Sequence, residues 1–266
     1  MSNHLENEVL YEIDQHVATI TFNRAEKQNT ISGPMLNRLS ELMLKADADP
    51  EIRAIVITGS GKFFCAGLDL RGSDISNNLA TNKKSPVTLD LKNTPPTVLH
   101  NLDTPTIASI NGSAAGYGMD LALGCDIRVM ADSAKLAAAF TARGVVPESG
   151  GTWILPRLIG WAKASEIIFT GKTLLAEECL ELGLVSHMVN NNEVGEKSLD
   201  IARQLSSRAP LAVQASKRMM RMGMNENFND HVHHVFLQLL PLFQSDDFAE
   251  GMASFMEKRE AEFKGK

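Results

Sequence analysis

Residues 106–156 read TIASINGSAAGYGMDLALGCDIRVMADSAKLAAAFTARGVVPESGGTWILP, and this stretch decides the fold of the chain. It begins with a short apolar strand, TIASI, and passes through Asn111, Gly112, Gly116 and Gly118 into the helical pattern MDLALGCDI. Glycines let a backbone approach a bound group closely, and the first N–H groups of a helix have no acceptor within the helix. The stretch therefore predicts an anion site built from backbone N–H groups.

A second piece of the same kind lies upstream. The strand AIVITGS (Ala54–Ser60) leads into GKFFCAGLDL (Gly61–Leu70). Two strand-to-turn segments that each offer a free N–H group can direct both groups at one oxygen atom. We therefore expect the two turns to meet at one site.

Composition limits the class of protein. A chain of 266 residues with 44% hydrophobic content can bury a large core in one domain with an appendage. A net charge of -6 argues against a nucleic-acid surface. Cys65, Cys125 and Cys179 lack C-x-x-C spacing, so we expect core thiols in a reducing compartment. The polar N-terminus and the lack of a membrane-length apolar run predict a soluble cytoplasmic protein with no membrane partner.

The first part of the chain shows a repeating pattern of strands and helices. Val9–Asp14 and Val17–Asn23 alternate as two strands, Pro34–Ala46 has one apolar helical face, and Ala54–Thr58 is a buried strand. The polar stretch Gly72–Thr97 is either a solvated insertion or a lid over the site. We favour the lid because this stretch follows the proposed anion-binding turn.

Helical patterns predominate after Pro156. The expected helices are Ala162–Thr170, Ala176–Leu182 and Gly195–Ser207, then amphipathic segments from Ala212 onward and a last helix over Phe248–Phe263. The apolar residues of this appendage either pack against one another or form contacts between subunits.

FCAGLDL and NGSAAGYGMDLALGCDI resemble the enoyl-CoA hydratase/isomerase (crotonase) superfamily. The resemblance continues through PESGGTWILPRLIG, FTGKTLLAEECLELGLVSHMV and EGMASFMEKREAEFKGK, and so covers nearly the whole chain in order. It implies an α/β fold, with a crotonase-like spiral of β-β-α repeats over residues 1–205 and a helical oligomerisation segment over 206–266. It also implies an acyl-CoA thioester substrate, no further cofactor because coenzyme A is part of the substrate, and a homotrimer or homohexamer.

The resemblance assigns an oxyanion hole to the backbone N–H groups of Leu68 and Tyr117. A family hydratase uses two glutamates, and the matching positions here hold Asp120 and Phe140. Phe140 cannot transfer a proton, so a water held between two carboxylates is hard to build. Tyr117 stands where glycine is more usual, and its side chain is expected to trim the pocket.

Glu148, in VVPESGG, is a carboxylic acid near the position where Phe140 stands in place of the second hydratase glutamate. From composition it is a surface turn residue that caps the helix starting near Thr152. By resemblance it is a catalytic base, because family members that shift a double bond from the 3-ene to the 2-ene place their single Glu in this turn. In that case Phe140, Val145 and Val146 would form an apolar wall beside it.

The other functional positions also come from the resemblance. Phe255 and Lys258 match positions that reach the adenine end of coenzyme A from a neighbouring subunit, although Lys258 is as readily a solvated helix residue. The substrate and coenzyme A positions are Lys27, Gln28, Ala66, Gly67, Asp69, Gly116, Phe140, Phe255 and Lys258.

Three histidines, His231, His233 and His234, cluster like metal ligands. No partner in the sequence completes a site, and we predict none. The favoured function is isomerisation of an enoyl-CoA by Glu148 with Asp120 as a helper. Hydration of a 2-enoyl-CoA is the first alternative, and a non-catalytic crotonase-fold binding module is the second alternative.

Overall fold

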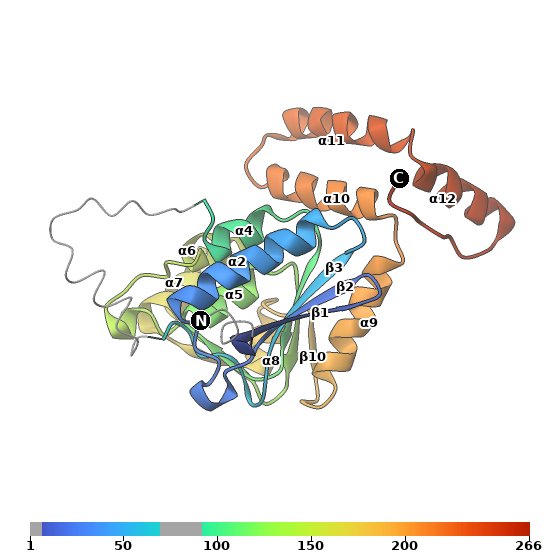
Figure 1. Cartoon of the computed structure of the whole chain (residues 1–266). Helices are drawn as coiled ribbons and strands as arrows, with labels where there is room; N and C mark the ends of the chain where they lie inside the picture. The colour runs from blue at the N-terminus through green and yellow to red at the C-terminus, as the bar shows by residue number, and fades with distance from the viewer. Residues whose placement is uncertain (1–6, 70–91) are drawn as a thin grey trace, which may run out of the picture.

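The computed structural model describes residues 7–69 and 92–266, and Figure 1 shows their arrangement. The larger sheet has the order β1-β2-β3-β5-β7-β10, in which β1 is antiparallel to β2 and the other neighbours are parallel. Its strands are β1 (Val9–Asp14), β2 (Val17–Phe22), β3 (Ala54–Gly59), β5 (Thr106–Ile110), β7 (Ile127–Ala131) and β10 (His187–Val189).

The smaller sheet has the order β4-β6-β8-β9. β4, β6 and β8 are parallel, and β9 closes the sheet antiparallel to β8. Each strand is three residues long: β4 (Phe63–Cys65), β6 (Ser113–Ala115), β8 (Lys135–Ala137) and β9 (Thr173–Leu175).

The chain alternates between the two sheets in successive turns. β3 leads to β4 and then to α4 (Pro95–Asn101); β5 leads to β6 and then to α5 (Tyr117–Gly124); β7 leads to β8 and then to α6 (Gly151–Ile159). Each turn thus gives one strand to each sheet and then one helix, which confirms the expected spiral of β-β-α repeats.

Two buried or half-buried asparagines hold the corners where the chain leaves the larger sheet. The Asn29 side-chain amide donates to Ser60 O at 2.9 Å and to Phe63 O at 2.7 Å. The Asn111 side chain accepts from Gly59 N at 3.2 Å and donates to Gly61 O at 3.0 Å. These bonds satisfy backbone groups that no strand partner reaches.

α2 (Gly33–Ala48) carries the apolar face that the sequence predicts. Met35, Leu39, Leu42 and Met43 are at most 1% exposed, in the core that includes β2 and β3. β3 is apolar on both faces, as is typical of a parallel strand covered on both sides.

The remaining helical elements lie around and beyond the sheets. Figure 1 shows α10, α11 and α12 at one end of the molecule, away from the sheets. These elements are η1 (Ala25–Lys27), η2 (Thr141–Arg143), α7 (Trp161–Thr170), α8 (Ala176–Glu181), α9 (Val194–Ser206), α10 (Pro210–Gly223), α11 (Phe228–Leu242) and α12 (Asp246–Glu257).

The helix predicted over MDLALGCDI is shorter than expected. α5 ends at Gly124, Cys125 is extended, and β7 begins at Ile127. The Asp126 carboxylate accepts from both N and Oγ1 of Thr106 at 2.7 Å. These bonds attach the start of β7 to the start of β5, so the chain leaves the helix there.

The last helix is also shorter than predicted. α12 ends at Glu257, and Lys258 has a left-handed φ of 56° that stops the helix. The following tail turns back, and the Asp247 carboxylate accepts from Lys264 N at 2.6 Å and Gly265 N at 2.9 Å. Residues 258–263 are therefore a returning segment and not helix.

Most of the polar stretch predicted as an insertion or lid, 72–97, lies outside the described residues. Its last residues are within them, and they are more regular than predicted, because α4 begins at Pro95. Proline suits the first turn of a helix, where its missing N–H is not needed.

Candidate active site

A cavity of about 780 Å³ lies where the corners of the two sheets meet. It brings together residues that are far apart in the sequence, from the η1 turn, the turn after β4, the start of α5 and the segment after β8. The predicted site residues that line it are Lys27, Gln28, Ala66, Gly67, Leu68, Asp69, Gly116, Tyr117, Phe140 and Glu148.

In this lining, the backbone N–H groups of Leu68 and Tyr117 have no acceptor among the described residues. Ala66 N, Asp69 N and Gly116 N all donate to carbonyl oxygens, whereas Leu68 N and Tyr117 N do not. Tyr117 is the first residue of α5, where an N–H has no partner within the helix and the helix dipole is positive. Both groups are thus free of an acceptor within the described chain.

Gly67 allows the two turns to touch. Its φ of +103° is strained for any residue with a side chain. A Cβ atom there would lie 2.9 Å from Ala115 O and 3.8 Å from Tyr117 N. The backbone before Leu68 therefore packs directly against the backbone before Tyr117.

Arg128 holds the other end of α5. Its guanidinium is buried and donates to Leu123 O at 3.3 Å, to Cys125 O and to Leu184 O at 2.5 Å. A cation at this end stabilises the last carbonyls of the helix and complements its dipole. The sequence did not single out this residue.

The two candidate acids have different environments. Asp120 is 2% exposed and is not among the residues that line the cavity. Its Oδ2 accepts from Ser149 Oγ at 2.8 Å and from Gly151 N at 3.1 Å. Burial raises the pKa of Asp120 to about 7, and the two hydrogen bonds partly oppose that rise.

Glu148, by contrast, is exposed and lines the cavity. It does not cap the following helix, because the N-cap of α6 is Gly150, at a φ of 97°, and no side chain bonds there. The interpretation of Glu148 as a helix cap is therefore wrong. Its carboxylate is free to face a ligand in the cavity.

The apolar wall agrees with the predicted one in part. Phe140, which is 4% exposed, and Val145, which is 52% exposed, both line the cavity, whereas Val146, at 66% exposure, does not. Tyr117, at 6% exposure, also lines it. Burial, with the negative charge of Glu148 next in effect, raises the pKa of the Tyr117 hydroxyl, so this side chain stays neutral.

The segment Leu136–Ala139 contributes residues both to the core and to the cavity. Leu136 and Ala138 are core residues at 0% and 1% exposure, whereas Ala139 lines the cavity.

Asp69 lines the cavity, but its carboxylate is paired. Arg24, which is 5% exposed, donates to Asp69 Oδ2 at 3.1 Å and to Thr30 O at 2.8 Å. This pair attaches the segment that carries Lys27 and Gln28 to the turn that carries Leu68. Arg24 is another residue that the sequence analysis missed, because its partner lies 45 positions away.

Phe255 and Lys258 do not line this cavity. Phe255 is 82% exposed on α12, and Lys258 is exposed where the tail turns back. Contact with coenzyme A from a neighbouring subunit stays a prediction.

The histidine cluster has a carboxylate partner that the sequence did not reveal. Glu226 accepts from or pairs with His231 Nδ1 at 3.1 Å and His234 Nδ1 at 2.9 Å. Within residues 7–69 and 92–266, no group of His, Cys, Asp and Glu side chains has the arrangement of a metal site. The contact ties the end of the α10–α11 connection to α11.

The cysteines are core thiols, as predicted. Cys65, Cys125 and Cys179 are free and buried, and burial raises the pKa of each to about 12. They are therefore protonated and unsuited to nucleophilic attack.

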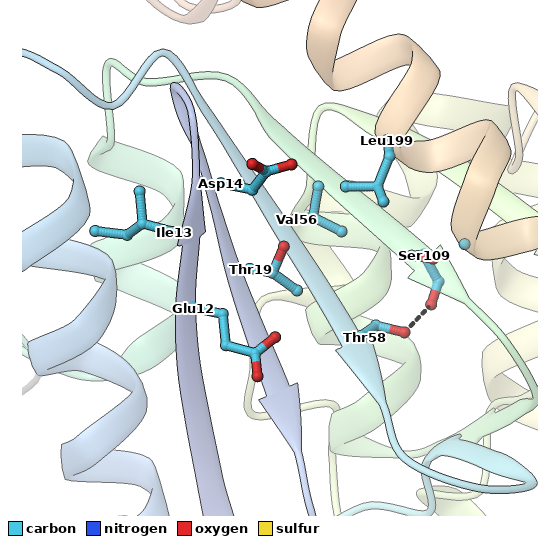
Figure 2. Close-up of a pocket in the computed structure, with 9 residues that line it drawn as sticks. Glu12, Ile13, Asp14, Thr19, Val56, Thr58, Ser109 and Leu199 are labelled. Carbon is cyan, nitrogen blue, oxygen red and sulfur yellow. Dashed lines mark hydrogen bonds between the residues drawn. The ribbon is translucent and has the colours of Figure 1, made fainter.

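A second cavity, of about 530 Å³, lies on the larger sheet beside α9. Figure 2 shows Asp14 of β1 on one side and Leu199 of α9 on the other with Val56 of β3 between them, while Thr58, below Leu199 in this view, donates to Ser109 O at 2.9 Å. None of the predicted site residues lies there, and we assign it no reaction.

In the part of the chain that the structure describes, no helix is long and apolar enough to cross a membrane.

Asp120→Asn tests the buried carboxyl group through stability. The pKa of Asp120 rises from an ordinary 3.8 to about 7 in the folded chain, so folding favours the protonated form. That stabilisation is fully present below the unfolded pKa and is lost as the pH rises through the folded pKa. Between about pH 4 and pH 7.5, the wild type should lose on the order of 2–4 kcal/mol of unfolding free energy relative to Asp120→Asn, as measured by urea denaturation. Parallel pH dependences for the two proteins would contradict the shifted pKa.

Comparison with known proteins agrees with this geometry. The family model described as enoyl-CoA hydratase/isomerase matches residues 12–266. The short-chain-enoyl-CoA hydratase of Clostridium acetobutylicum is 32% identical over 96% of this chain and 97% of its own length. The 1,2-epoxyphenylacetyl-CoA isomerase of Escherichia coli is 31% identical over 97% of this chain and 98% of its own length. The crystal structure of an enoyl-CoA hydratase from Bacillus anthracis superposes with a TM-score of 0.88 at 30% identity, covering 97% of this chain and 100% of that one. The chain belongs to the enoyl-CoA hydratase/isomerase family.

Proposed function

We propose that this chain shifts the double bond of an enoyl-CoA from the 3-ene to the 2-ene position, with Glu148 as the single base. The observation that carries the proposal is the arrangement of the two acids. Glu148 lines the cavity that holds the two free N–H groups, whereas the Asp120 carboxylate is hydrogen-bonded behind it.

The reaction needs one proton acceptor and one stabilised anion. In the proposed reaction, Glu148 removes a proton from C2, and the C2–H electron pair enters an enolate whose oxygen accepts from Leu68 N–H and Tyr117 N–H. The same carboxyl group then returns the proton to C4, which it joins through the C3–C4 double-bond electron pair. The enolate pair meanwhile forms the C2–C3 double bond, and the thioester carbonyl is restored. No water enters this sequence, so a second acid is not required.

Hydration makes a different demand on the site. It adds water across the 2-ene and uses two acids or bases on one water molecule. Phe140 occupies one of the two positions that resemblance assigns to those groups, and Asp120 at the other is engaged by Ser149 and Gly151. These features favour isomerisation over hydration, although named relatives include both an isomerase and a hydratase.

Glu148→Gln should lower kcat on a 3-enoyl-CoA by at least about a hundredfold, because glutamine keeps the size of the side chain and removes the base. Turnover is measured by the ultraviolet absorbance of the conjugated product, with binding of acetyl-CoA by calorimetry as the control for folding. Efficient hydration of a 2-enoyl-CoA by the wild type, with no action on the 3-enoyl-CoA, would overturn the isomerase proposal. Failure to bind any acyl-CoA would favour a non-catalytic binding module instead.

The oxyanion hole has its own test at Tyr117. Proline is tolerated at the first position of a helix but has no N–H, so Tyr117→Pro removes one of the two proposed donors. We expect kcat to fall by about a hundredfold or more. The matched control is Tyr117→Ala, which loses the phenol ring and keeps the N–H. Equal losses in both variants would mean that the ring, not the N–H group, is what matters.

We also propose that the chain assembles into homotrimers or dimers of trimers through its C-terminal segment. α11 has no buried residue, and it exposes Phe236 and Leu240 by 57% and 56%. On α12, Phe255 and Met256 are 82% and 77% exposed. Large apolar side chains so exposed along successive helices are typical of a contact surface.

Light scattering at micromolar concentration should give the mass of three or six chains. Leu237→Glu, on α11 at 62% exposure, should shift the mass toward that of one chain, because it places a charge in the proposed contact. A wild type that is monomeric would contradict the assembly.

A further inference from the structure

We propose that Asp120 and Ser149 are positioning residues that hold the turn carrying Glu148, and that neither transfers a proton to the substrate. The inference rests on the proposed role of Glu148 as the base. It assigns to Ser149 a role that neither the motif nor the family resemblance indicates.

The contacts converge on one oxygen atom. Asp120 Oδ2 accepts from Ser149 Oγ at 2.8 Å and from Gly151 N at 3.1 Å. Ser149 directly follows Glu148, and Gly150 between the two donors has a left-handed φ of 97°. One carboxylate oxygen of Asp120 therefore holds the turn at two places, Ser149 and Gly151. The proposed base, Glu148, directly precedes Ser149.

Burial makes these bonds stronger constraints than the same bonds at a surface. Asp120 and Ser149 are each 2% exposed, so water does not replace a lost partner. A buried polar group that loses its hydrogen bond destabilises the fold, and the effect is larger where the group is charged. The turn and the acid are thus held together in one arrangement.

Gly151 shows how closely the carboxyl group fills its site. A Cβ atom on Gly151 would lie 2.2 Å from Asp120 Oδ1 and 2.6 Å from Oδ2. A side chain at this position would displace the carboxyl group. The absence of a side chain at 151 is therefore part of the same contact.

Asp120, which holds the Glu148 turn, and Tyr117, whose N–H is a proposed oxyanion donor, lie on the same turn of helix α5. Tyr117 begins α5 and Asp120 is three residues later in its first turn. A shift of this turn would move the N–H donor and the support of the base together. A misplacement of about 1 Å in such a constellation can lower the rate about a hundredfold.

Asparagine separates positioning from proton transfer at residue 120. Its carbonyl oxygen can occupy the place of Oδ2 and accept from both donors, whereas its amide cannot act as an acid or base. Asp120→Asn should therefore retain at least about a tenth of the wild-type kcat, with a kcat–pH profile of unchanged shape. A group that transfers a proton would cost at least about a hundredfold when replaced in this way.

Ser149→Ala and Asp120→Ala remove the contact itself. We expect each to lower kcat by about ten- to a hundredfold with KM changed less than about threefold, since the acyl-CoA contacts remain. The double variant should lose no more than Asp120→Ala alone, because both changes break one interaction. Ser216→Ala, on an exposed part of α10, is the matched control.

The outcomes are distinct. Loss of activity in Asp120→Asn as large as that in Glu148→Gln would overturn the positioning role, and so would an unchanged kcat in Ser149→Ala. If Asp120→Ala does not fold, Asp120→Asn and Ser149→Ala still decide the question. Wild-type activity in Glu148→Gln would instead refute the proposed function and leave the contact without a base to position.

Discussion

The approach of two turns at Gly67 and Tyr117 is the constraint on which the rest of the site depends. A Cβ on Gly67 would meet Ala115 O at 2.9 Å, so only a residue without a side chain lets these backbones pack together. Each turn of the spiral brings the chain from the larger sheet to the smaller one, and the segments that follow the first two crossings, β3 to β4 and β5 to β6, line the same cavity. The side chains of Asn29 and Asn111 hold those crossings by bonds to the backbone at 59–63.

α5 links this constraint to the chemistry. Its first residue, Tyr117, lines the cavity, its first turn holds Asp120 against the Glu148 turn, and its last carbonyls accept hydrogen bonds from Arg128. The helix is eight residues long and too short to be stable alone. Its stability comes from tertiary contacts, which also give it one fixed position relative to Gly67.

Local features of the sequence predict the buried strands, the apolar face of α2 and the glycine turns, because these depend on neighbours within a few positions. The spiral and most of the cavity lining were expected from the family resemblance. The three-residue strands β6, β8 and β9 are too short to show alternation, so they were not predicted. Contacts such as Arg24 with Asp69, or Asp247 with Lys264 N, join distant positions, and no local pattern predicts them. The sequence places Asp120 on the first turn of a helix, but the direction of its carboxylate depends on Ser149 and Gly151.

The different exposure of the two acids fits the different tasks that we propose for them. In the proposed reaction the base has to reach both C2 and C4, which requires a side chain that lines the cavity, as that of Glu148 does. Asp120 could reach the substrate only by giving up two hydrogen bonds in a buried place, where the loss is largest. A carboxyl group fixed in this way is better suited to holding a turn than to moving a proton. The burial that raises the pKa of Asp120 thus also makes this residue a rigid support. Glu148, which is exposed, stays free to act on a ligand.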